Sequence, residues 1–186
     1  MCFALALPLI IHLWSLLKKE TSIQRLLSIY WKITSLLPIS ILLLSGNKNI
    51  GYLTFFLTPY LMVICLWLWI DLNEELTALP PWRGLALTVK IWRWIIAIFA
   101  ILITPITGSG LNCIKYQNSE VCSYIKEAPE SFHSLTSSIF KFLFGANWNE
   151  PLAGFVGVLG LIVYVVGLLQ WVLTKMLKQG RVAGEF

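Results

Sequence analysis

The stretch LAGFVGVLGLIVYVVGLLQWVLT, residues 152–174, contains no charged side chain and decides the fold class. A helix needs about 20 consecutive apolar residues to cross roughly 30 Å of hydrocarbon, so this stretch predicts a transmembrane helix. The composition of the whole chain agrees, because 58% of its 186 residues are hydrophobic and only 12% are charged. Soluble domains typically contain about 45–50% apolar and about 25% charged residues. The chain is therefore predicted to be an integral membrane protein.

Apolar stretches of similar character precede this one. They cover residues 2–17, 26–45, 51–70 and 86–106. The predicted fold is an all-α, polytopic bundle of about five transmembrane helices that forms one integral membrane domain over residues 1–186. Residues 107–150 are left as one long loop, in which apolar residues recur at helical spacing and predict a short amphipathic helix. These apolar residues are Phe132, Leu135, Ile139, Phe142 and Leu143.

The distribution of Lys and Arg predicts the direction of the spans. One set of span ends carries Lys18, Lys19, Arg25, Arg83, Lys90, Arg93, Lys175, Lys178 and Arg181. The opposite set carries only Lys48, Lys115, Lys126 and Lys141. Positive residues accumulate on the cytoplasmic side, so the amino terminus is predicted to lie outside and the carboxyl terminus in the cytoplasm. The first span is interpreted as a retained anchor rather than a signal peptide, because its charges follow its apolar core; a start upstream of Met1 stays open.

The net charge of +5 and the pI near 9.1 do not indicate a nucleic-acid partner. The positive side chains stand at helix ends in ones and twos, where they set topology and face lipid headgroups. The lipid bilayer is therefore the first predicted partner.

Acidic residues follow the third span at helical spacing. Asp71, Glu74 and Glu75 would share one face of a continuing helix, at its carboxyl end, where the helix dipole disfavours anions. The bases expected at the same membrane boundary are Lys32, Arg83, Lys90 and Arg93. We interpret these seven residues as an inner-face cluster that forms ion pairs or docks a partner. A metal site is disfavoured because neither His nor Cys lies nearby.

Three further features concern binding and packing. His12 lies near the middle of a span and could ligate a chlorophyll, whereas a bis-His haem is disfavoured because His133 falls in the outer loop. Cys113 and Cys122 share the outer loop, where a disulfide is permitted and is predicted. A row of small residues in the last span predicts close packing against another helix, in the chain or in a partner. This row consists of Ala153, Gly154, Gly157 and Gly160.

Three motifs resemble a multi-pass membrane protein family of cyanobacteria. They are LLSIYWK at 26–32, WLWIDLNEE at 67–75 and KQGR at 178–181. The resemblance runs from the second span to the carboxyl terminus. It implies a thylakoid or plasma membrane and a lumenal or periplasmic outer side, and it brings no activity with it.

No catalytic fingerprint, such as a nucleophile elbow or a phosphate loop, occurs in the sequence. The leading hypothesis is a non-enzymatic accessory or assembly factor for a membrane complex, such as a photosynthetic one, without a cofactor. A small transporter or channel is the first alternative, for which Thr34, Ser35, Ser40 and Thr54 supply polar groups. A pigment-binding protein that uses His12 is the second alternative.

Overall fold

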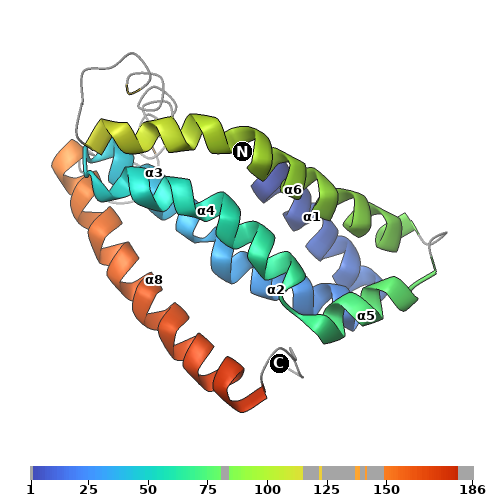
Figure 1. The fold of residues 1–186 in the computed structure, drawn as a ribbon. Coiled ribbons are helices and arrows are strands. Elements are labelled where there is room, and N and C mark those ends of the chain that lie inside the picture. Colours follow the sequence, from blue (N-terminus) through green and yellow to red (C-terminus); the bar gives the residue numbers. More distant parts are fainter. Residues whose placement is uncertain are drawn as a thin grey trace. The chain divides into compact units, whose positions relative to one another are not determined.

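The structure is a computed structural model that describes residues 2–80, 84–114, 122, 137–138, 141 and 149–179. These residues form helices and contain no strand, which confirms the predicted all-α class (Figure 1). The helices are α1 (Cys2–Lys18), α2 (Thr21–Thr34), α3 (Leu36–Ser45), α4 (Ile50–Trp67), α5 (Ile70–Ala78), α6 (Gly84–Gly110) and α8 (Glu150–Gln179), with a 3-10 helix, η1 (Leu111–Ile114), after α6.

Four segments of the described chain are long and apolar enough to cross a membrane. They are Thr21–Ser45, Ile50–Trp67, Gly84–Ile114 and Glu150–Thr174. A shorter apolar helix, Ala4–Lys18, lies where the first of the five predicted spans was expected. α1 has 17 residues, at the lower limit of about 17–25 for a spanning helix.

Two spans contain a proline near which the sequence predicts an interruption or an end, Pro38 and Pro105. The second span breaks at Ser35, which separates α2 from α3, and Pro38 lies in the first turn of α3, where the missing N–H costs no hydrogen bond. The fourth span was expected to end near Pro105, but α6 continues through it to Gly110. Membrane helices tolerate an internal proline because hydroxyl groups and local adjustment satisfy the freed backbone groups. Thr107 Oγ1 donates to the Ile103 carbonyl at 3.1 Å in this region.

The turn between α3 and α4 is tight, as the sequence GNKN at 46–49 predicts. Asn47 adopts φ 53°, in the left-handed region that asparagine tolerates. The Asn47 N–H donates to the Leu44 carbonyl at 3.0 Å, and the Lys48 N–H donates to the Leu43 carbonyl at 2.9 Å. These two bonds make a Schellman motif, which satisfies carbonyls at the end of α3. The second and third spans therefore form a helical hairpin.

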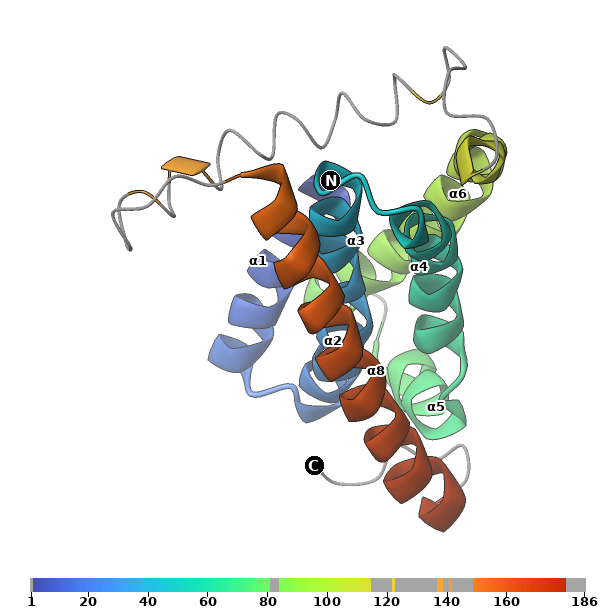
Figure 2. The same cartoon turned by 90° about the vertical axis from the view of Figure 1, so that its left-hand side faces the viewer.

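The contacts divide the chain into two compact units. Unit 1 consists of Met1–Thr34, Pro59–Leu102 and Gly167–Phe186. Within it α2 packs against α1 and α5 (Figure 2). Tyr30 of α2 is fully buried, donates from its hydroxyl to the Ala4 carbonyl at 2.9 Å and meets the Trp92 ring edge-on at 4.9 Å. One tyrosine thus links α1, α2 and α6 in the core of unit 1.

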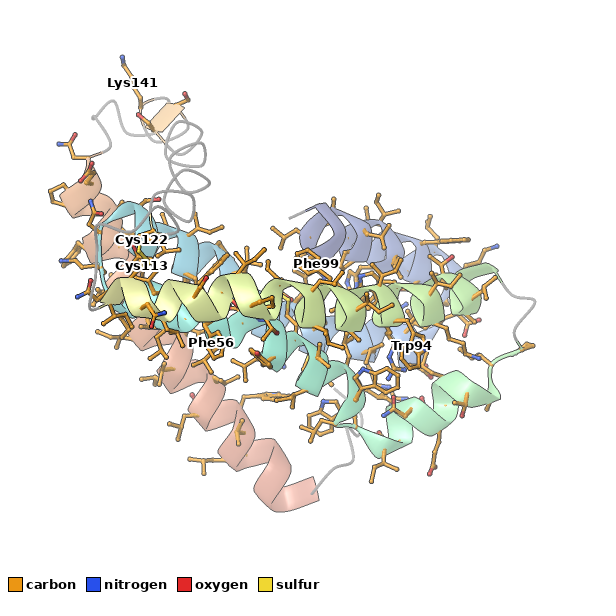
Figure 3. All side chains as sticks on the ribbon, turned by 45° about the horizontal axis from the view of Figure 1, so that its top comes forward. Phe56, Trp94, Phe99, Cys113, Cys122 and Lys141 are labelled. Carbon is orange, nitrogen blue, oxygen red and sulfur yellow. A yellow bond between two sulfur atoms is a disulfide. The ribbon has the colours of Figure 1, made fainter. Side chains whose placement is uncertain are left out.

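Unit 2 consists of Ser35–Thr58 and Ile103–Val166. Its core includes Leu44, Tyr52, Cys113 and Cys122, with Phe55 packed against them. The two cysteines lie together beside the end of α6 (Figure 3). This core of unit 2 is therefore formed by residues of the α3–α4 hairpin and by the cysteine pair.

Some expectations stay predictions. The amphipathic helix expected around residues 132–143 lies outside the described residues, except for Ser137, Ser138 and Lys141. The single domain and the orientation of the termini likewise stay predictions.

Candidate functional site

The acidic residues after the third span belong to a separate helix. α4 ends at Trp67, Trp69 is extended (φ −87°, ψ 113°), and α5 begins at Ile70. Asn73 bridges the break, because its Nδ2 donates to the Trp67 carbonyl at 3.0 Å. Asp71 consequently lies in the first turn of α5. The expected carboxyl-end position was wrong for it, since the dipole of α5 favours an anion there.

Arg93 of α6 holds the end of α4. The residue is buried, with 6% of its surface exposed. Its Nη2 donates to the Leu66 carbonyl at 2.7 Å and also to Asn73 Oδ1, and its guanidinium lies 4.3 Å from the centroid of the Trp67 ring. A cation is favourable at a helix carboxyl end, where carbonyls lack intrahelical partners. Arg93 thus bonds neutral oxygens rather than the carboxylates that the sequence suggested.

The ion pair at this end of unit 1 uses a base outside the expected set. Arg25 Nη2 lies 2.6 Å from Glu75 Oε2 and 2.9 Å from Glu75 Oε1. The pair joins α2 to α5. The expected bases were wrong for Glu75, because Arg25 was placed only among the topology-setting charges. The register that brings Arg25 under α5 depends on the break after Trp67, which no proline or glycine marks.

We expect a small effect when this ion pair is removed. The Arg25 and Glu75 side chains are 20% and 39% exposed, and ion pairs of such exposure contribute about 0.2–1 kcal/mol. Glu75→Gln should therefore lower the free energy of unfolding by at most about 1 kcal/mol, and Glu74→Gln, the exposed neighbour, should change it less. Denaturant unfolding of the two variants in mixed micelles checks this order. Equal losses in both would contradict the pairing.

Tryptophans lie beside two of the cations, Lys32 and Arg93. Lys32 Nζ lies 5.1 Å from the centroid of the Trp171 ring, and Trp171 meets Trp69 edge-on at 5.7 Å. Trp67 meets Trp94 in the same manner at 5.5 Å. We call Lys32, Arg93 and these four tryptophans the tryptophan–cation cluster. Its members come from α2, α4, the α4–α5 link, α6 and α8, and Figure 3 labels Trp94 on α6.

The tryptophan–cation cluster contains unsatisfied donors. Trp69 is 1% exposed, and the indole Nε1 atoms of Trp69 and Trp171 are buried without a hydrogen-bond partner in the described structure. Sequence reasoning singled out Lys32 and Arg93 but missed the tryptophans. The signal was present, because Trp67, Trp94 and Trp171 stand near the predicted inner ends of their spans, where membrane proteins concentrate tryptophan.

The other residues of the expected inner-face cluster lie on α5 and α6 or outside the described residues. Asp71 is partly buried and Glu74 is exposed on α5, while Lys90 is partly buried on α6. Arg83 lies outside the described residues. The described residues contain no group of three or more His, Cys, Asp or Glu side chains that could hold a metal ion.

His12 is partly buried on α1. Its Nδ1 atom is buried and has no hydrogen-bond partner among the described residues, and its carbonyl accepts a bond from Ser15 Oγ at 2.7 Å. An imidazole nitrogen in this state can ligate a metal centre. The expected chlorophyll contact at His12 stays a prediction.

The small residues at the start of α8 face α3 within unit 2. A Cβ atom on Gly46, after α3, would lie 2.2 Å from Gly154 Cα. A Cβ on Gly157 would lie 3.0 Å from the Leu43 nitrogen, and one on Gly160 would meet Ile39 at 3.6 Å. Ala153 is fully buried. This close backbone approach requires glycine at Gly46 and Gly154, so the row packs within the chain.

The disulfide is formed. Cys113 and Cys122 are bonded, their Cα atoms are 5.7 Å apart, and both residues are buried. The bond ties residue 122 to η1, next to Leu44 and Tyr52 of the hairpin. Its position in the core of unit 2 indicates a structural role.

We expect the double variant Cys113→Ala, Cys122→Ala to unfold with a free energy about 2.5–3 kcal/mol lower, because closing a loop of this size removes chain entropy from the unfolded state. Chemical unfolding of the solubilised protein measures the loss. Reductant present during unfolding should lower the stability of the wild type by the same amount and leave the variant unchanged. A reductant effect on the variant would contradict this account.

Among the comparisons with known proteins, only a protein family matches the chain. No curated protein and no solved structure matches the chain. One family matches over residues 1–184, nearly the whole length. A match of this extent shows membership, and the chain therefore belongs to the family described as "Protein of unknown function (DUF3177)".

Proposed function

We propose that this protein is a non-enzymatic integral membrane subunit that stabilises or helps to assemble a complex of other membrane proteins. One observation carries the proposal. Only 17% of the spanning window of α8 is buried inside the structure, against 56% for the window of Thr21–Ser45. Among the candidate spans of the described residues, α8 thus has the smallest buried share, which leaves its surface open to a partner helix.

The exposed surface of α8 is apolar along its length. Its large exposed apolar side chains are Phe155, Val158, Leu159, Ile162, Val163, Val165, Val166, Leu169 and Leu173. A Cβ atom on Gly167 would meet nothing within 4 Å, whereas Gly154 and Gly157 are closed by α3 and the turn after it. Helices in lipid associate closely where small residues allow it. The partner proposed is a transmembrane helix of another protein.

The charged groups support a scaffolding role. Arg93 is hydrogen-bonded to Leu66 and Asn73, and Glu75 is paired with Arg25, so these groups rigidify the end of unit 1. Trp171 of α8 meets Trp69 edge-on at 5.7 Å, and the indole Nε1 atoms of both are buried without a hydrogen-bond partner among the described residues. Buried donors normally have partners.

Two of the four polar groups suggested for a transport path, Ser40 and Thr54, bond to their own helices. Ser40 Oγ donates to the Leu36 carbonyl at 2.8 Å, and Thr54 Oγ1 donates to the Gly51 carbonyl at 3.0 Å. A hydroxyl committed to its own helix is a poor lining for an aqueous path. We therefore rank a transporter below a subunit, and substrate-dependent uptake in proteoliposomes would reverse that order.

The proposal also names the membrane in which the protein lies and the orientation of its termini. The resemblance to a cyanobacterial family favours a photosynthetic complex of the thylakoid or plasma membrane. In this membrane the amino terminus lies on the lumenal or periplasmic side and the carboxyl terminus in the cytoplasm, as the positive residues predict.

Affinity purification of the tagged chain from solubilised native membranes tests the proposal. We expect a membrane subunit to co-purify in a fixed ratio, and Val166→Trp to reduce its recovery at least tenfold by obstructing α8. The matched control is Leu102→Trp on α6, because the exposed fractions of Val166 and Leu102 are 60% and 67%. Recovery of the chain alone, or equal losses in both variants, would contradict the proposal.

A second candidate function, pigment binding, rests on the unpartnered Nδ1 of His12. The purified sample should then show visible absorption that His12→Ala removes. A spectrum without such a band, or one unchanged in the variant, would reject this candidate.

A further inference from the structure

A pocket in unit 1 lies between the carboxyl end of α1 and the first residues of α6. Its volume is about 520 Å³, and its lining includes Trp14, Lys18, Glu20, Gly84 and Leu85. Ligand pockets typically measure about 300–1,000 Å³, so the space is large enough for a small polar group. Trp14 closes part of the wall, because its ring lies 3.6 Å from the position of a Cβ on Gly84.

The sequence predicts that this pocket lies at the headgroup layer. Lys18 is among the positive residues that predict the cytoplasmic boundary, and α1 ends with it. α1 carries Trp14 one turn earlier, and tryptophan concentrates at the membrane–water interface. A ligand that enters here from the membrane presents its polar headgroup first.

The lining contains one positive and one negative side chain, Lys18 and Glu20, together with the amino end of α6. Lys18 is exposed, and its ammonium makes no ion pair with a carboxylate of the described residues. The lining also includes the first two residues of α6, a helix of 27 residues whose opening N–H groups have no intrahelical acceptors. Glu20 adds a carboxylate, which accepts hydrogen bonds from hydroxyl groups. The complementary ligand therefore combines one anionic group with hydroxyls.

Apolar side chains continue from the pocket along both helices. Leu13 and Leu17 of α1 are 55% and 83% exposed, and Leu87 of α6 is 46% exposed. Such surfaces accommodate acyl chains, which a soluble anion does not have.

We propose that this pocket binds the headgroup of an anionic lipid that carries hydroxyl groups. Lys18 and the amino end of α6 face the anionic oxygen atoms, Glu20 accepts the hydroxyls, and Trp14 covers the headgroup. The inference is independent of the proposed subunit function, because it concerns lipid rather than a protein partner.

Native mass spectrometry of the delipidated full chain tests the proposal, with phosphatidylglycerol as the probe and phosphatidylcholine at equal concentration as the reference. We expect phosphatidylglycerol adducts to dominate. Lys18→Gln should weaken the retention of phosphatidylglycerol about fivefold, the effect of one cation at an anionic lipid. Lys19→Gln, which removes an adjacent charge outside the pocket lining, should leave retention unchanged.

Two further measurements complete the test, one with a variant that fills the pocket and one with a soluble competitor. Gly84→Leu fills the pocket without changing the charge and should reduce retention as much as Lys18→Gln, while size-exclusion profiles establish that both variants are folded. Soluble glycerol 3-phosphate should not displace the lipid. Equal retention of both lipids, equal effects of Lys18→Gln and Lys19→Gln, or displacement by glycerol 3-phosphate would each overturn the proposal.

Discussion

Replacing Arg93 by Met is expected to lower the free energy of unfolding by about 2–4 kcal/mol. The variant keeps the apolar volume but removes the donor that Leu66 and Asn73 share. A hydrogen bond to a charged group contributes about 1.5–3 kcal/mol, and a buried acceptor left without a partner costs about 1–3 kcal/mol. The loss is partly offset because a guanidinium no longer has to be buried.

Chemical unfolding in mixed micelles measures this change. Lys90→Met provides the matched control, because Lys90 lies on the same helix and makes none of these bonds; it should change the stability by less than about 0.5 kcal/mol. Arg93→Lys should fall between the wild type and Arg93→Met, since a point charge replaces the planar fork less well. Equal stability of the Arg93→Met and Lys90→Met variants would show that Arg93 does not hold the α4–α5 break.

Gly46→Ala should lower the free energy of unfolding by about 3 kcal/mol. The backbone of Gly46, at φ −84° and ψ 12°, tolerates a side chain, so the effect is steric. The new Cβ would lie 2.2 Å from Gly154 Cα, and two backbones must separate to admit it.

Gly167→Ala is the control for this experiment. Its Cβ would meet nothing within 4 Å, and Ala exceeds Gly in helix propensity by about 0.8–1 kcal/mol. The control should therefore gain stability while Gly46→Ala loses it. Thermal unfolding of both variants in the same detergent gives the two signs, and a neutral result for Gly46→Ala would contradict the close approach of α8 to the α3 end.

The features that the sequence predicted are those set by local physics. The apolar lengths predict the long spans, and GNKN at 46–49 predicts the hairpin turn because asparagine accepts a left-handed backbone. The cysteine pair is predicted by its compartment, since oxidising compartments permit disulfides. The turn needs only a few neighbouring residues, whereas the compartment of the cysteines follows from the distribution of Lys and Arg along the chain.

The features that escaped prediction depend on distant contacts. The break after Trp67 is held by Asn73 and Arg93 from two other helices, and no local breaker marks it. α6 continues through Pro105, although an internal proline usually ends or kinks a helix. That rule holds more strictly in water than in lipid. The pairing of Glu75 with Arg25 follows from that break, so it could not be deduced from helical spacing.

Photocrosslinking from α8 tests the central claim, that this chain is a subunit whose last span contacts another membrane protein. A photoreactive residue is placed at Val163, which is 66% exposed, and in a control at Leu102 of α6, which is 67% exposed. After illumination of native membranes, the account predicts a discrete protein adduct of defined mass from position 163 and none of that mass from position 102. Lipid adducts alone at position 163, or the same adduct from both positions, would contradict it.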